Sequence, residues 1–385
     1  MAKDLLSLEN LVVNFYTYEG TVEAIDRISF KLKEGETLGL VGETGCGKSV
    51  TSLSVLSLVP SPGKIEHGQV FFKREDGMID LLGQDEGFLR SVRGKDISMI
   101  FQDARSALNP VYTVNEQISE VFLHHKVKEL CEKVLEGIEN DLSEGGSLKD
   151  LVYRLERKIY RKMLENPNSF SIRIVSRIPI LSRYKRRLKR EARKEVARIL
   201  KEMKIPDPNR VADMYPHELS GGMAQRVVTA MALGCNPYLL LADEPTTNLD
   251  VTIQAQILQL IKQLKAKFGS SVLYVTHDLG VIAELCDRVA VMYAGNICEL
   301  ADVFEIFKKP LHPYTQGLLE SIPHPGKAFK SIEGEVPALI NPPLGCRFHP
   351  RCPKAMEICA RDKPAFVEIQ KDHFVSCHIH SRSSR

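Results

Sequence analysis

Residues 42–49 constrain the fold of this chain more than any other segment. They read Gly-Glu-Thr-Gly-Cys-Gly-Lys-Ser and match the phosphate-loop pattern G-x-x-x-x-G-K-[ST] at every position. An apolar run at 37–41 precedes the loop, and residues 49–58 have the composition of a helix. A strand, this loop and a helix, in that order, direct backbone N–H groups at phosphate oxygens, so the segment predicts a nucleotide site. There we expect Lys48 to reach the outer phosphates and the Ser49 hydroxyl to bind Mg²⁺.

A second glycine turn, Ser220-Gly221-Gly222, precedes an apolar helix predicted at 223–233. Its N–H groups could also receive an anion, although serine before a helix is an ordinary cap as well. Two apolar strands follow, one ending in Asp243 and Glu244 and the other in His277. Because strands of a parallel α/β sheet present their carboxyl ends to the ligand, these polar groups are expected at the nucleotide.

These motifs, in this order, resemble the nucleotide-binding subunit of an ATP-binding cassette (ABC) transporter over nearly the whole chain. The segments 99–103, 106–110, 215–223, 312–315 and 345–348 are similar to the peptide and oligopeptide importer ATPases. Within that branch Leu219 and Met223 resemble the D-type subunit, which in such systems pairs with a related F-type chain.

The resemblance implies an α/β fold: an ABC-type P-loop NTPase core with an antiparallel β subdomain, an expanded helical subdomain and a small cysteine-containing C-terminal appendage. The expected boundaries are 1–107 for the β subdomain and first part of the core, and 108–225 for the helical subdomain. Residues 226–300 are expected to form the second part of the core, and 301–385 the C-terminal domain.

The resemblance also assigns roles in ATP hydrolysis. Glu244 is expected to polarise the attacking water, His277 to contact the γ-phosphate, and Gln102 to contact the metal and the water. Mg²⁺ is expected to be held by Ser49, Gln102 and Asp243. The residues expected to bind ATP are Tyr18, Gly42, Glu43, Thr44, Gly45, Cys46, Gly47, Lys48, Ser49 and Val50. Tyr18 is the candidate for stacking on adenine, with Tyr16 close by.

In this family the signature of one subunit closes over the ATP held by the phosphate loop of another. That role implies contacts from Ser220, Gly221, Gly222 and Gln225 to the partner's nucleotide, and places Asp250 in the loop that contacts the dimer partner. Closure on ATP and opening after hydrolysis would drive the membrane subunits.

The segment from about 126 to 193 departs from the family as a basic insertion. Residues 149–204 contain 19 lysines and arginines against 6 aspartates and glutamates, in a chain whose net charge is +3. Apolar residues at helical spacing (Leu148, Leu151, Val152, Leu155, Ile159 and Met163) predict a helix over 149–164, and 183–204 predicts another. A solvated helical hairpin, contact with anionic lipid and contact with nucleic acid all remain open from sequence.

Four of the nine cysteines, Cys346, Cys352, Cys359 and Cys377, lie in the last forty residues at the spacing C-x5-C-x6-C-x17-C. In a chain without an apolar signal core, such a cluster favours metal over disulfide, and the spacing alone does not separate iron–sulfur from zinc. The resemblance favours a structural [4Fe–4S] cluster, with zinc or uncomplexed thiols as alternatives. Four nearby histidines could also be ligands or merely surface residues: His349, His373, His378 and His380.

The function implied is an ATPase that powers solute import, with peptide as the default solute and nickel complexes or oligosaccharides as alternatives. The implied partners are a second, F-type ATPase subunit, two transmembrane permease subunits and, indirectly, an extracytoplasmic solute-binding protein. The chain is expected at the cytoplasmic face of the membrane, without nucleic acid. The alternative is a soluble ABC ATPase acting on ribosomes or nucleic acid, and the signature and His277 disfavour a phosphate-loop kinase.

Overall fold

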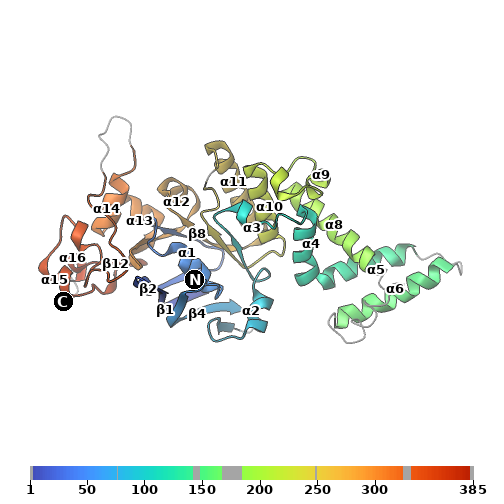
Figure 1. The fold of residues 1–385 in the computed structure, drawn as a ribbon, viewed down its shortest axis with the longest axis horizontal. Helices are drawn as coiled ribbons and strands as arrows, with labels where there is room; N and C mark the ends of the chain where they lie inside the picture. Colours follow the sequence, from blue (N-terminus) through green and yellow to red (C-terminus); the bar gives the residue numbers. More distant parts are fainter. Residues whose placement is uncertain are drawn as a thin grey trace. The chain divides into compact units, whose positions relative to one another are not determined.

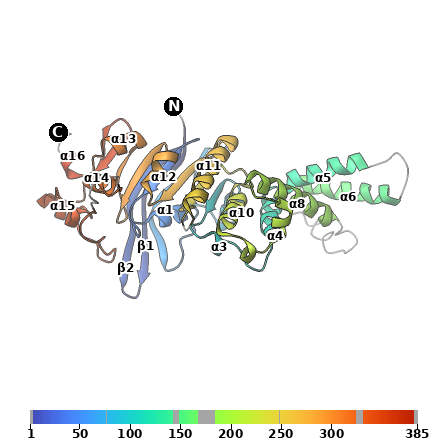
Figure 2. The same ribbon diagram turned by 90° about the horizontal axis from the view of Figure 1, so that it is seen from above.

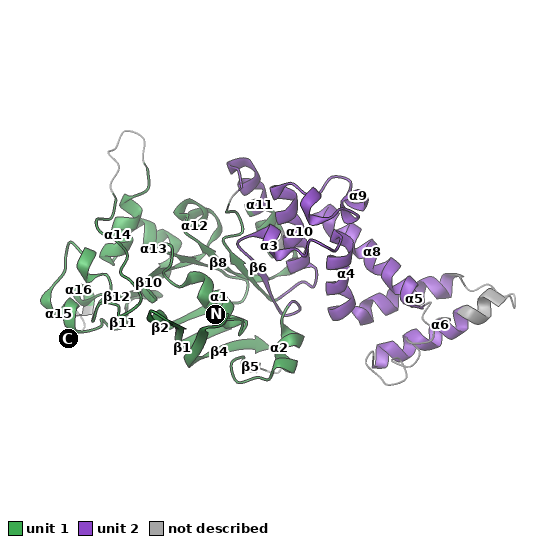
Figure 3. Ribbon diagram, viewed as in Figure 1, with its two compact units in different colours: residues 1–93, 238–247, 258–385 green, residues 94–237, 248–257 purple. Residues whose placement is uncertain are grey.

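The computed structural model describes residues 3–75, 77–141, 148–166, 184–247, 249–323 and 331–381. The chain forms two compact units, coloured separately in Figure 3. Unit 1 comprises residues 1–93, 238–247 and 258–385, and unit 2 comprises residues 94–237 and 248–257. The predicted helical subdomain, 108–225, falls within unit 2, while the subdomain boundaries themselves stay predictions.

An antiparallel sheet forms the first layer of unit 1, with strand order β2-β1-β4-β5 (Figure 1). Its strands are β1 (Asp4–Thr17), β2 (Gly20–Lys33), β4 (Gly63–Arg74) and β5 (Gly77–Asp80). The antiparallel strands predicted over 7–33 are therefore confirmed. Residues 5–8 of β1 are all buried, and because successive side chains of a strand point to opposite faces, both faces of the sheet are covered there.

The second sheet of unit 1 has the order β11-β12-β10-β9-β3-β8-β7. Its strands are β3 (Thr37–Val41), β7 (Leu239–Asp243), β8 (Ser271–Thr276), β9 (Arg288–Tyr293), β10 (Asn296–Asp302), β11 (Phe366–Gln370) and β12 (His373–Ser376). β3 pairs in parallel with β8 and β9, and β7 pairs in parallel with β8. Every residue of β3, β7 and β8 is buried, as their continuous apolar sequences require.

The helices of unit 1 follow the strands. They are α1 (Lys48–Val55), α2 (Glu86–Val92), α12 (Leu279–Leu285), α13 (Val303–Lys308), α14 (Pro313–Glu320), η3 (His349–Arg351), α15 (Glu357–Arg361) and α16 (His378–Ser381). α11 (Val251–Phe268) contributes residues to both units. The C-terminal residues thus extend the central sheet by two strands and add short helices rather than forming a unit of their own.

Unit 2 is mainly helical, as predicted. Its elements are β6 (Ile97–Ile100), α3 (Ala104–Ala107), α4 (Val114–His125), α5 (Val127–Asp141), α6 (Leu148–Glu165), α8 (Tyr184–Glu202), α9 (Pro208–Ala212), η2 (Pro216–Glu218) and α10 (Gly221–Leu233). Figures 1 and 2 show α5 and α6 side by side, projecting from the other helices of the unit. None of the helices in the described ranges is both long and apolar enough to cross a bilayer.

The basic insertion contains both helices that its periodicity predicts, α6 and α8. One detail is wrong: Leu155, expected on the apolar face, is 46% exposed, whereas Glu156 is buried and lies 3.0 Å from the Nε of Arg187. The hydroxyl of the buried Tyr160 donates to the carbonyl of Tyr184 and joins the two helices. The rest of the insertion, at 142–147 and 167–183, lies outside the described residues.

Candidate nucleotide site and four-cysteine region

The phosphate loop connects the buried strand β3 to α1 in unit 1. Two of its glycines have no room for a side chain: a Cβ on Gly42 would lie 2.0 Å from the carbonyl oxygen of Met292, and one on Gly47 would lie 2.5 Å from that of Ala24. Gly47 also has a φ of +102°, which disfavours other residues. The loop therefore packs closely against the backbone of Ala24 and Met292, while Thr44 and Gly45 at its tip are exposed.

Lys48 lies inside this loop. Its ammonium nitrogen donates to the carbonyl oxygens of Gly42 at 2.8 Å and Glu43 at 3.0 Å. The buried Cys46 and the half-buried Val50, in the first turn of α1, complete the predicted segment. A lysine held by loop carbonyls leaves a concave turn of backbone with one cation at its centre, which suits a phosphate chain.

Ser49 and Asp243 meet although 194 residues separate them. The Ser49 hydroxyl donates to Oδ1 of Asp243 at 3.0 Å, because β7 ends beside the start of α1. Asp243 is buried, and burial raises its pKa against the opposing effect of the Ser49 hydrogen bond. A hydroxyl and a partly desolvated carboxylate at this separation are oxygen ligands of the kind that Mg²⁺ prefers.

Glu244 and His277 also meet, at the ends of neighbouring strands β7 and β8. Nδ1 of His277 lies 3.1 Å from Oε1 of Glu244, and the Thr247 hydroxyl donates to Oε2 at 2.9 Å. Desolvation acts to raise the pKa of Glu244, but the hydrogen bonds from His277 and Thr247 outweigh it and lower the pKa. Glu244 has a φ of +43°, a left-handed conformation that turns the chain sharply after the strand.

The remaining motif residues belong to unit 2. Gln102 is exposed just after β6. Ser220 is exposed and caps α10, its hydroxyl oxygen accepting from the N–H of Met223 at 3.3 Å. Gly221 is exposed and Gly222 half-buried, whereas Gln225 is buried on the inner face of α10. Asp250 is exposed and accepts from the N–H of Ile253 at 2.9 Å at the start of α11.

The aromatic candidates lie at the far end of the β1–β2 hairpin. Tyr18 is in the turn and 98% exposed, so none of the described residues covers its ring. Tyr16 is about half exposed, and its hydroxyl donates to Glu66 at 2.9 Å. An exposed ring is open to stacking on adenine, and Tyr18 stays a prediction.

Two side chains near the C-terminus reach the phosphate loop, and sequence reasoning assigned them no role. The backbone N–H of Glu43 donates to the Tyr314 hydroxyl at 3.1 Å, and Nη1 of Arg351 lies 3.1 Å from both carboxylate oxygens of Glu43. Tyr314 lies in the segment 312–315 that resembles the importer branch, whereas Arg351 lies three residues beyond the other such segment, 345–348. That resemblance was the available signal, but it carried no information on their contacts.

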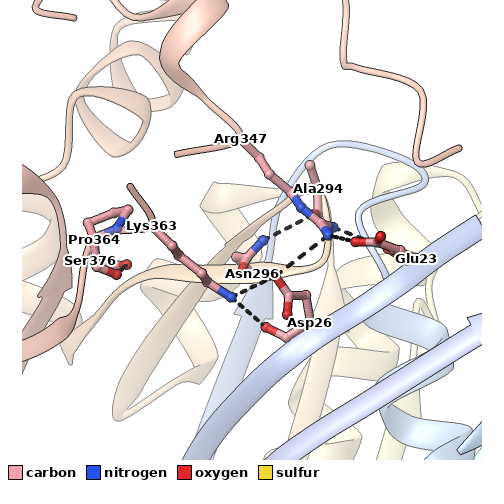
Figure 4. Close-up of polar contacts among 8 residues, drawn as sticks. All are labelled: Glu23, Asp26, Ala294, Asn296, Arg347, Lys363, Pro364 and Ser376. Atoms are coloured by element: carbon pink, nitrogen blue, oxygen red, sulfur yellow. Dashed lines mark hydrogen bonds and ion pairs between the residues drawn. The ribbon is translucent and has the colours of Figure 1, made fainter. Parts of the chain in front are cut away.

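A second set of contacts joins the C-terminal residues to β2 and the β9–β10 turn (Figure 4). Nη1 of Arg347 donates to the carbonyl oxygen of Ala294 at 2.7 Å, and its guanidinium pairs with Glu23. Lys363 donates to Oδ2 of Asp26 at 2.7 Å. Burial lowers the pKa of both cations against the effect of these carboxylates. The C-terminal residues are therefore anchored to the nucleotide core at two places.

The four C-terminal cysteines line one small enclosed cavity, of about 10 Å³, together with His312, His349 and His378. The N–H of Cys346 donates to the carbonyl oxygen of Cys359 at 2.8 Å, which holds these two segments side by side. Burial, with repulsion from the neighbouring cysteines, raises the pKa of Cys346 to about 11 and also raises those of Cys352 and Cys377. Within the described ranges no three Cys, His, Asp or Glu side chains are arranged as a ready metal site, and no disulfide is present.

The four nearby histidines have other contacts. His373 lies 2.8 Å from the fully buried Glu299, and His349 contacts the carbonyl oxygen of Cys346. His378 and His380 contact the carbonyl oxygens of Asp362 and Leu311. Glu299 also accepts from the N–H groups of Leu311 and His312, so its pKa is lowered although desolvation opposes this. This network fixes the start of α14 against β10 and β12.

The comparisons with known proteins agree with these motifs. The ABC transporter family model matches residues 25–247, and the model described as the C-terminal region of oligopeptide/dipeptide transporters matches residues 298–359. The dipeptide transport ATP-binding protein DppD of Bacillus subtilis is 42% identical over 379 residues, covering 97% of this chain and 94% of that protein. The oligopeptide transport ATP-binding protein AppD of the same organism is 41% identical, covering 98% and 97%.

Solved structures share the fold. A dimeric post-hydrolysis state of the ATP-binding cassette MJ0796, bound to ADP and Pi, is 24% identical with a TM-score of 0.54, covering 78% of this chain and 99% of that chain. The structure of cbiO1 from Clostridium perfringens gives a TM-score of 0.51 at 23% identity, covering 80% and 92%. The fold and the loop motifs together define a phosphate-loop ATPase of the cassette type.

The chain belongs to the ABC transporter ATP-binding family, in the branch that carries the oligopeptide/dipeptide transporter C-terminal region. Members of this family are ATPases coupled to transport. Neither the ribosome-associated alternative nor the kinase alternative is favoured by these matches.

Proposed function

We propose that this chain hydrolyses ATP to power the import of peptides across a membrane. The observation that carries the proposal is the meeting of the loop serine with Asp243, and of Glu244 with His277, at adjacent strand ends of one unit. The names of the relatives support peptide as the solute: DppD is described as a dipeptide transporter component and AppD as an oligopeptide one. Oligosaccharide and nickel have no such support.

The residues divide the chemistry among themselves. The loop N–H groups and Lys48 bind and orient the triphosphate. Ser49 and Asp243 would hold Mg²⁺, which supplies charge neutralisation for phosphoryl transfer, with Gln102 as a further ligand. Glu244, kept ionised by His277 and Thr247, accepts a hydrogen bond from the attacking water and orients it. His277 contacts the γ-phosphate.

The proposed assembly is a dimer with a related F-type subunit, in which Ser220, Gly221, Gly222 and Gln225 complete the partner's ATP site. Exposure of the serine and its first glycine at a helix start supports that role, since their N–H groups are accessible to an anion. Two permease subunits would hold the dimer at the cytoplasmic face of the membrane, supplied by a solute-binding protein outside.

Reconstitution tests this function. The chain, its predicted partner subunits and the binding protein are assembled in liposomes, and ATP hydrolysis and uptake of a radiolabelled dipeptide are measured together. We expect peptide-loaded binding protein to stimulate hydrolysis and ATP to drive uptake. Stimulation by RNA or ribosomes instead, with no dipeptide uptake, would favour the alternative function.

We also propose that Cys346, Cys352, Cys359 and Cys377 bind a [4Fe–4S] cluster, with zinc as the alternative. Four sulfurs around one cavity suit either thiophilic group, and a cation would offset the burial and the repulsion that raise the pKa values of Cys346, Cys352 and Cys377. The cavity holds about one water-sized atom, so a cubane would require the sulfurs to move apart. Anaerobic purification with iron and zinc analysis decides: brown protein with iron supports the cluster, and colourless protein with neither metal refutes both.

A further inference from the structure

Glu43, the second residue of the phosphate loop, is held at three points. Its N–H donates to the Tyr314 hydroxyl, and its carbonyl oxygen accepts from Lys48. Its carboxylate pairs with Arg351, whose Nη1 lies 3.1 Å from both oxygens. Two of these three contacts come from residues about three hundred positions further along the chain. The conformation of this loop is therefore set partly by the C-terminal residues.

Arg351 is itself fixed in place. Its side chain is only 6% exposed, and its Nε donates to the carbonyl oxygen of Glu333 at 3.0 Å. Nη1 also donates to the hydroxyl of Tyr293, at the end of β9, at 3.2 Å. A buried guanidinium with partners on both sides loses little further freedom when it pairs with a carboxylate. The Arg351–Glu43 pair thus acts as a rigid connection between η3 and the phosphate loop.

The negative charge of Glu43 explains why an arginine at this position would favour nucleotide binding. A carboxylate in a loop that receives a triphosphate places a negative charge near other negative charges, which weakens binding. Arg351 neutralises that carboxylate, and it is shielded from solvent by its burial. Removing the arginine would leave the Glu43 carboxylate without its charge partner beside the bound phosphates.

Arg347 supplies a second anchor from the same short segment. Its contacts to Ala294 and Glu23 hold the segment against β2 and the β9–β10 turn, as Figure 4 shows. Ala24 follows Glu23 in β2, and its carbonyl oxygen is the atom with which a side chain at position 47 would clash. Residues 347–351 therefore contact both Glu43, the second residue of the phosphate loop, and the part of β2 that packs against Gly47 of the same loop.

We propose that Arg351 is a positioning residue of the nucleotide site: it neutralises Glu43 and fixes the phosphate loop for binding of a nucleoside triphosphate. In consequence the C-terminal region is part of the ATP site and not an independent appendage. The inference rests on the proposed function, that the loop binds ATP. Each experiment below therefore also measures ATP binding by the wild-type protein.

Titration calorimetry with Mg-ATP on the full chain tests the proposal. Arg351→Gln should weaken ATP affinity about tenfold, because a charge-assisted pair is lost and a carboxylate is unmasked. The double variant Glu43→Gln with Arg351→Gln should return to within about threefold of wild type, since the unmasked charge is then gone. Arg361→Gln, a matched change at an exposed arginine of α15, should leave affinity unchanged.

Steady-state hydrolysis by the assembled complex gives a second readout. Arg351→Gln should raise the KM for ATP by about the same factor while kcat stays within about twofold, because chemistry at Glu244 is not altered. Arg351→Lys, which keeps the charge and perturbs the fold least, should weaken affinity about threefold. Wild-type affinity in both Arg351 variants, or a double variant as weak as Arg351→Gln alone, would overturn the proposal. Failure of the wild type to bind ATP would instead refute the proposed function.

Discussion

The two glycine turns of this chain look alike in sequence but are held in different ways. The phosphate loop of unit 1 is fastened by side chains from distant parts of the sequence, among them Asp243, Tyr314 and Arg351. The turn at Ser220 in unit 2 is held by its own helix cap and by one hydrogen bond from Arg105 to the carbonyl oxygen of Leu219, and it leaves Ser220 and Gly221 exposed. The difference suits their proposed roles, since one turn completes a site within its own chain and the other completes the site of a partner.

The largest effect is expected at Glu244, the residue assigned to the attacking water. Glu244→Gln should reduce kcat about 100-fold or more while ATP affinity is retained, because the neutral amide lacks the negative charge with which Glu244 polarises the attacking water. Single-turnover hydrolysis and calorimetry measure the two quantities. Glu284→Gln, an exposed change in α12, is the control, and wild-type turnover in Glu244→Gln would remove Glu244 from its assigned role.

A substitution in the second turn should show its effect only in the assembled complex. Ser220→Glu should reduce hydrolysis by the assembled complex about tenfold or more, since a carboxylate at this helix start repels the partner's γ-phosphate. ATP binding to the isolated chain should not change. Ser91→Glu at an exposed position of α2 is the matched control. An equal loss of ATP affinity in the isolated chain would mean that the two turns do not differ as described.

A smaller effect is expected at the loop's hydrogen bond to α14. Tyr314→Phe removes the acceptor of the Glu43 N–H and should weaken ATP affinity about threefold to fivefold, the equivalent of about 1 kcal/mol. Tyr238→Phe removes the hydroxyl of an exposed tyrosine and should leave ATP affinity unchanged. An unchanged affinity in Tyr314→Phe would show that this contact does not order the loop for nucleotide.

The smallest effect concerns pH. The Glu244 carboxylate acts in its ionised form, so hydrolysis should fall as the pH drops through its pKa, which His277 and Thr247 lower. Thr247→Val removes one stabilising hydrogen bond from the ionised form. The pKa then rises, and the acid limb of the kcat profile should move to higher pH by less than about one unit. Thr17→Val, in the β1–β2 hairpin, is the control; a shift to lower pH would contradict the assignment.

Sequence alone was sufficient for the parts of the site that follow from local pattern. Short segments whose residue spacing determines the local structure predicted three features: the phosphate loop, the strand ends at Asp243 and His277, and the capped start of α10. The meeting of Ser49 with Asp243 follows from the parallel strand order: only β8 lies between β3 and β7, and all three strands present their carboxyl ends at the same edge of the sheet.

The contacts made by the C-terminal region could not be predicted in this way. No periodicity relates Arg351 to Glu43, which lie 308 positions apart, and only the packing of η3 brings them together. The insertion shows the same limit on a smaller scale. The helical period predicted α6 correctly, but the ion pair with Arg187 draws Glu156 inward while Leu155 faces outward.

The two strands added by the C-terminal residues have one more consequence. β12 pairs with β10, so the outer side of β10 does not end the sheet with a row of open backbone donors and acceptors. The new border, β11, is five residues long and carries Glu368 at its centre, features that discourage pairing with strands of other molecules. Shortening the chain before Phe366 would expose β10 as a template for intermolecular pairing, so aggregation would accompany any loss of nucleotide affinity.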